Sequence, residues 1–131
     1  MPVHWSLDAD VLSLVFDGEY SFRDIADAAR AGLAAAGHPV RLLVDATGTA
    51  RLPDTAGVRQ RIDLLIGLRD YLAGPVAIVA SPGAMFGIAR QVAQQADLED
   101  RVTIEVFDSL AAARSWIGDQ SGGSLRGSPE T

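Results

Sequence analysis

Apolar residues follow two different periods along this chain of 131 residues. The segments HWSLD from His4 and VLSLVFDG from Val11 are short and rich in β-branched and aromatic residues, which predicts two strands in an antiparallel hairpin. The segments VRLLVDATG from Val40 and PVAIVAS from Pro75 are almost continuously apolar, which is typical of strands buried on both faces. VTIEVF from Val102 predicts a fifth strand.

Helical patterns fill the segments between these strands. A capping residue at Ser21 and a terminating glycine at Gly37 delimit a first helix. Further helices are expected from Thr55 to Leu72, over AMFGIARQVAQQAD from Ala84, and from Ser109 to Ile117. The order ββαβαβαβα predicts one α/β domain with a mixed, mostly parallel sheet of about five strands and about four helices.

Composition sets the extent of this domain. With 48% hydrophobic residues, the chain can bury one core without covalent staples. The last residues, 119–131 with the sequence DQSGGSLRGSPET, are rich in Gly and Ser and poor in apolar side chains. Their burial of apolar surface cannot offset the conformational entropy lost on ordering. We therefore expect a domain over residues 1–118 and a disordered tail over residues 119–131.

Charge and residue types exclude several classes of function. The net charge is −6, and the 11 basic residues are all scattered arginines, so we expect no nucleic acid partner. The chain has no cysteine, and His4 and His38 lack a spaced partner ligand, so we expect no metal and no cofactor. No apolar run is long enough for a membrane span and no signal peptide is apparent, which predicts a cytoplasmic protein. The absence of lysine and asparagine is typical of a GC-rich, bacterial genome.

The second predicted helix differs from the first in the width of its apolar arc. Its apolar side chains cover roughly 220° of the circumference, more than one sheet face covers. They are Val58, Ile62, Leu64, Leu65, Ile66, Leu68, Tyr71 and Leu72. Either the third helix covers the excess, or this surface meets a partner protein, a second copy or an apolar ligand. From the second interpretation we predict a homodimer through this helix.

Two segments resemble a known family. VAIVASPGAMFGIARQVAQQA from Val76 and VTIEVFDSLAAARSWI from Val102 are similar to the SpoIIAA-like proteins, relatives of the STAS domain of anti-sigma-factor antagonists. The most distinctive positions are Phe86, Gly87 and Arg90, which follow a strand. The resemblance implies a mixed sheet with helices on its faces, no established catalytic activity, and either partner-switch regulation or binding of lipid-like molecules.

The resemblance also draws attention to the start of the second helix. STAS antagonists carry Asp-Ser-Ser-Gly there, and the second serine accepts a phosphate from a partner kinase. Asp54, Thr55, Ala56 and Gly57 resemble this motif, but alanine replaces the phosphoacceptor. Thr55 is the remaining candidate for such a switch. The alternative is that Asp54 or Thr55 only caps the helix.

A second polar cluster follows the strand that begins at Val40. Asp45, Thr47 and Thr49 stand near its carboxyl end, where open α/β sheets usually bind ligands. They are candidates for a polar crevice, although an aspartate there more often forms an Asx turn. No nucleophile and base can be assembled around Asp45, so catalysis at this position is the weakest hypothesis and we do not expect an enzyme.

Three hypotheses for function follow. The first is a noncatalytic regulatory or protein-interaction module, and the second is a carrier of a small hydrophobic or lipid-like ligand, with walls that include Ile62, Ile66, Met85 and Phe86. The third is a small enzyme that uses Asp45. The candidate interaction surface comprises Arg61, Ile62, Ile66, Arg69, Met85, Phe86 and Arg90.

Overall fold

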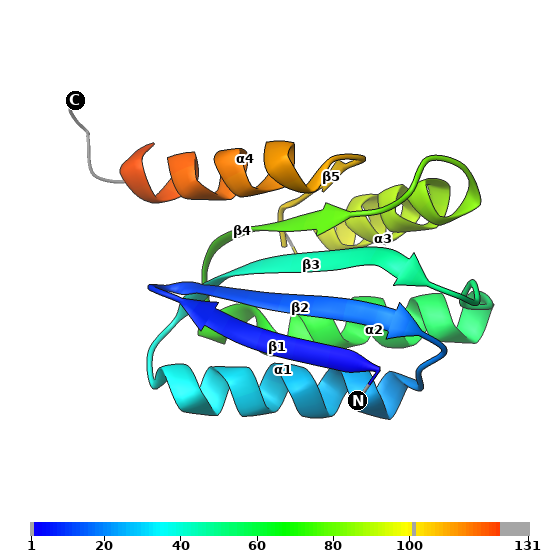
Figure 1. Ribbon diagram of the computed structural model, residues 1–131, viewed down its shortest axis with the longest axis horizontal. Coiled ribbons are helices and arrows are strands. Elements are labelled where there is room, and N and C mark those ends of the chain that lie inside the picture. The colour runs from blue at the N-terminus through cyan, green and yellow to red at the C-terminus, as the bar shows by residue number, and fades with distance from the viewer. Residues whose placement is uncertain (1, 101, 124–131) are drawn as a thin grey trace.

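One mixed sheet forms the centre of the computed structural model, which describes residues 2–100 and 102–123 (Figure 1). Its strands are β1 (Val3–Asp8), β2 (Val11–Gly18), β3 (Val40–Thr49), β4 (Leu72–Val79) and β5 (Ile104–Phe107). They lie in the order β1-β2-β3-β4-β5. The pair β1 and β2 is antiparallel, and each later pair is parallel. The predicted α/β fold with a mostly parallel sheet is confirmed.

The helices are divided between the two faces of the sheet. They are α1 (Phe22–Ala36), α2 (Thr55–Leu68), the short 3₁₀ helix η1 (Arg69–Tyr71), α3 (Ala84–Asp100) and α4 (Leu110–Gly123). Because the parallel strands are neighbours in chain order and their crossovers share one hand, the connecting helices α1, α2 and α3 lie on the same face. Helix α4 follows the last strand and covers the opposite face (Figure 1).

Each face of the sheet therefore has its own core. The period-two alternation of β2 directs Leu12, Leu14 and Phe16 into the larger core beneath α1, α2 and α3. On the other face, Leu43 of β3 packs with Ile117 of α4 in a smaller core. The central strands β3 and β4 contribute to both cores, which explains why their sequences lack alternation.

The predicted boundaries of α1 are confirmed in detail. The hydroxyl of Ser21 accepts a hydrogen bond from the backbone N–H of Asp24 at 3.2 Å, and the Asp24 carboxylate accepts one from the Ser21 N–H at 2.9 Å. Gly37 ends the helix with a φ of 71°, a left-handed conformation that glycine adopts without steric cost.

The second helix is shorter than predicted, and its apolar arc is partly covered. It ends at Leu68, while Tyr71 lies in η1 and Leu72 is the first residue of β4. Four side chains of the arc are buried, namely Val58, Ile62, Leu65 and Leu68, and Leu64 and Ile66 are half-buried. Helix α3 packs alongside α2 and covers part of the excess, whereas Leu64, Leu68 and Tyr71 line an open groove beside α1. Tyr71, which is 57% exposed, is the main remnant of the expected patch.

The last helix is longer than predicted. Helix α4 continues to Gly123 and so includes the first residues of the segment that we expected to be a tail. Gly118 does not adopt a positive φ, so it does not end the helix. Residues 124–131 lie outside the described part of the chain. Within residues 2–100 and 102–123, no helix has the length and apolar character needed to cross a bilayer.

A buried arginine joins β3 to α4. Arg41 is 7% exposed, and its guanidinium donates hydrogen bonds to the Ile117 carbonyl and to the carboxylate of Asp10. The hydrogen bond from Arg41 lowers the pKa of Asp10 below its usual value. Arg41 therefore connects the β1–β2 turn, the central strand and the last helix.

Candidate ligand-binding site

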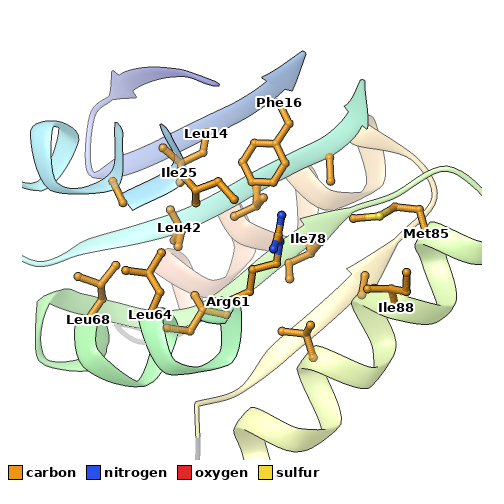
Figure 2. A pocket seen from close by; sticks show the side chains of 16 residues that line it. Leu14, Phe16, Ile25, Leu42, Arg61, Leu64, Leu68, Ile78, Met85 and Ile88 are labelled. Carbon is orange, nitrogen blue, oxygen red and sulfur yellow. The ribbon is translucent and has the colours of Figure 1, made fainter. Parts of the chain in front are cut away.

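A small apolar cavity lies between the sheet and the helices α1, α2 and α3 (Figure 2). Its volume is about 70 Å³. The strands contribute Leu14, Phe16, Leu42, Val44, Ala46 and Ile78, and the helices contribute Ile25, Ala29, Arg61, Leu64, Leu65, Leu68, Met85, Ile88, Ala89 and Val92. Every lining residue except Arg61 is apolar.

The cavity exists because small side chains meet at this level of the core. Ala29 of α1, Ala46 of β3 and Ala89 of α3 are all buried and line it, so three different elements supply a methyl group where a larger side chain would fill the space. The half-buried side chains Leu64 and Met85 come from α2 and α3. They place the accessible side of the cavity between these two helices.

The guanidinium of Arg61 is the polar group of this cavity. Figure 2 shows the side chain rising from α2 among the apolar side chains, with its nitrogens directed toward Phe16 and Ile78. Its Nη1 donates a hydrogen bond to the carbonyl of Gly57 at 2.8 Å. Its Nε is buried and has no hydrogen-bond partner. A buried N–H without a partner costs free energy, so this group is available to a ligand.

Tyr20 holds the arginine from the other side. The Cζ atom of Arg61 lies 5.8 Å from the centre of the Tyr20 ring, within the range of a cation–π interaction. The ring of Tyr20 packs against Phe16 with centroids 4.7 Å apart, and its hydroxyl is 3.0 Å from Oγ1 of Thr49. Thr49 thus supports the wall of the apolar cavity.

The predicted polar crevice does not assemble around Asp45. Oδ1 of Asp45 accepts hydrogen bonds from the N–H of Thr47 at 3.1 Å and from its hydroxyl at 2.6 Å, which is the Asx-turn arrangement. Asp45 is the last residue of β3 that pairs with β4, and β3 continues along β2 as far as Thr49. Thr49 is engaged with Tyr20, and so it does not join the other two residues.

Asp54 occupies the N-cap position of α2. Its carboxylate accepts a hydrogen bond from the N–H of Gly57 at 2.8 Å. Thr55 is exposed at the first position of the helix. A Cβ atom at Gly57 would lie 3.1 Å from Nη1 of Arg61, so the glycine leaves room for the arginine that enters the cavity.

The residues of the predicted interaction surface are distributed over several places. Arg61 and Met85 line the cavity, whereas Ile62 is buried in the core. Phe86 and Arg90 line a separate groove of about 270 Å³ beside β5. Ile66 is half-buried against the core, and Arg69 is exposed after the end of α2.

Sequence reasoning missed the role of Tyr20. Its signal is weak, because Tyr20 follows the glycine at the end of β2, where a polar or aromatic side chain usually faces solvent. The structure also offers no alternative metal centre, since among the described residues no three His, Asp or Glu side chains gather as metal ligands would.

These features define an α/β protein with a SpoIIAA-like fold and an apolar cavity that carries one arginine. Among solved structures, the chain is similar to an uncharacterized protein of the DUF3478 family with a SpoIIAA-like fold from Shewanella loihica PV-4, with a TM-score of 0.59 and 16% identity. The similarity covers 88% of this chain and 91% of that chain, and confirms the resemblance at the level of the fold. No family model matches the sequence. A comparison with curated proteins gave no match.

Proposed function

We propose that the protein is a noncatalytic regulatory module that binds a small hydrophobic ligand in the cavity between α2, α3 and the sheet. The observation that carries this proposal is the cavity of about 70 Å³, whose walls are apolar apart from Arg61. Ligand sites are typically apolar hollows with a few polar groups that fix orientation. Binding is favoured over catalysis because the lining holds neither a nucleophile nor a general base.

Helix α2 connects this binding site to a surface that a partner protein could contact. The Arg61 side chain lies against the cavity and its Nη1 bonds to the Gly57 carbonyl in the first turn of α2. A ligand that moves Arg61 would therefore change the end of the helix where Asp54 and Thr55 are accessible to a partner. Regulation in this sense combines the first two hypotheses drawn from the sequence.

Filling the cavity from within tests this proposal. Ala89→Leu adds three carbon atoms to a buried wall residue, so we expect it to abolish binding of a neutral test ligand such as 1-propanol. The readout is the methyl signal of Met85, one of 2 methionines in the chain, during titration of the ¹³C-methyl-methionine-labelled protein.

The matched control is Ala31→Leu, the same substitution at an exposed position of α1. This variant should show the same saturable shift of the Met85 signal as the unmodified protein. An unmodified protein in which 1-propanol leaves the Met85 signal unchanged would contradict the proposal.

A second candidate function is recognition of a protein partner or a second copy at the N-terminal end of α2. It is favoured by Leu52, an apolar side chain that is 47% exposed in the loop before Asp54 and Thr55. If this surface forms a homodimer, Leu52→Glu should convert it to a monomer in light scattering at micromolar concentration, while Tyr71→Glu, at the far end of α2, should not. A protein that is monomeric before any substitution would rule out self-association.

A further inference from the structure

We infer that the cavity selects short aliphatic carboxylates, with Arg61 as the residue that determines this specificity. The inference rests on the proposed function, because it identifies the chemical class of ligand for the same cavity. The evidence for it is the charge of Arg61 and the small volume and apolar walls of the cavity.

Arg61 has an unused hydrogen-bond donor and lines the cavity. Its Nη1 donates to the Gly57 carbonyl at 2.8 Å, but the buried Nε has no partner. The planar guanidinium presents pairs of N–H groups that match the two oxygens of a carboxylate. A carboxylate bound to the guanidinium through Nε would satisfy this donor.

Among the side chains that the structure describes, none supplies a negative charge to Arg61. The guanidinium groups of Arg41, Arg51 and Arg59 pair with carboxylates. For Arg61, no such carboxylate lies within ion-pair distance among the residues that the structure describes, and its other neighbour is the neutral ring of Tyr20. A cation among apolar walls interacts strongly with an anion because little water screens the pair.

The volume limits the apolar part of the ligand. A space of about 70 Å³ is roughly half of the ~150 Å³ that holds benzene in an engineered apolar cavity. The walls beside Arg61, including Phe16, Val44 and Ile78, are buried and offer no further hydrogen-bond donor or acceptor from their side chains. The matching ligand has an aliphatic part of about two or three carbon atoms and one terminal carboxylate.

Two test ligands of the same shape separate charge from size. Propionate and its amide, propionamide, are titrated at pH 7 into the methyl-labelled protein, and the Met85 signal reports occupancy. A charge-assisted bidentate pair is stronger than neutral hydrogen bonds, so we expect propionate to bind at least about tenfold more tightly than propionamide. Arg61→Met should remove this preference and retain binding of the amide.

Arg59→Met is the matched control, because Arg59 lies on the same helix but pairs with Asp63 outside the cavity. It should keep the preference for propionate. Equal affinities of the two ligands in the unmodified protein would overturn the inference and leave the proposed cavity function standing, whereas absence of binding by both would overturn the proposed function as well. If circular dichroism shows that Arg61→Met is unfolded, the acid and amide comparison in the unmodified protein still decides the question.

Discussion

Arg41→Ala is expected to lower the free energy of unfolding by about 3 kcal/mol, one of the largest single effects in this protein. The substitution removes a buried side chain together with its hydrogen bonds to the Ile117 carbonyl and the Asp10 carboxylate. It therefore loosens the docking of α4 on the sheet and the attachment of the β1–β2 turn. Urea denaturation followed by circular dichroism measures the loss.

Three variants separate the causes of this effect. Arg41→Met keeps most of the apolar packing and should destabilise the protein less than Arg41→Ala. Arg30→Ala, at an exposed position of α1, should change the free energy of unfolding by less than about 0.5 kcal/mol.

Asp10→Asn tests the ion pair between Asp10 and Arg41. Because the folded state lowers the pKa of Asp10, its stabilising effect is present above the unfolded pKa of about 4 and disappears as the pH falls through the lower folded value.

The stability difference between the unmodified protein and Asp10→Asn should thus be constant near neutral pH and shrink below about pH 4. A difference that instead grows under acid conditions would contradict the pairing of Asp10 with Arg41. So would an Arg41→Ala variant as stable as the unmodified protein.

Gly48→Ala is expected to destabilise the protein by about 2 to 3 kcal/mol. A Cβ atom at Gly48 would lie 2.4 Å from the backbone carbonyl oxygen of Phe16, a contact that the paired strands β2 and β3 cannot relieve by a side-chain rotation. The backbone would have to separate at the point where Phe16 and Ala46 line the cavity. We therefore expect weaker binding of 1-propanol as well as a lower urea midpoint.

The control for Gly48→Ala is the same change at Gly67. Gly67 is exposed on α2, and a Cβ atom there meets nothing within 4 Å. Alanine has the higher helix propensity, so Gly67→Ala should stabilise the protein by about 0.5 to 1 kcal/mol. If both substitutions had the same effect, the close approach of β3 to Phe16 would not be what requires glycine at position 48.

The elements of the fold could be predicted because their signals are local. The β-branched and aromatic residues of β2, the continuous apolar runs of β3 and β4 and the capping residue Ser21 are each local signals, and each element is found as expected. The end of α2 was wrong by several residues because apolar Tyr71 and Leu72 continue the helical pattern, although the chain leaves the helix for β4. Periodicity does not distinguish an apolar residue of a helix from the first residue of the next strand.

The candidate site could be predicted only in part, because it depends on contacts between distant segments. Six of the apolar residues assigned to the wide arc lie on α2, but the sequence does not reveal how much of that arc α3 covers. Arg61 and Met85 were named from the sequence, whereas the buried alanines that leave the cavity open carry no distinguishing signal. Arg41 offered a clue, since an arginine inside a strand with two buried faces requires buried partners.

Transfer of magnetisation between a bound ligand and the protein tests the central claim most directly. In an isotope-filtered nuclear Overhauser experiment on the protein saturated with propionamide, we predict cross-peaks from the ligand methyl group to the methyl groups of Met85, Ile78 and Ile88, which line the cavity. Cross-peaks confined to the exposed methyl groups of Leu52 or Val15 would place the ligand on the surface and contradict the account.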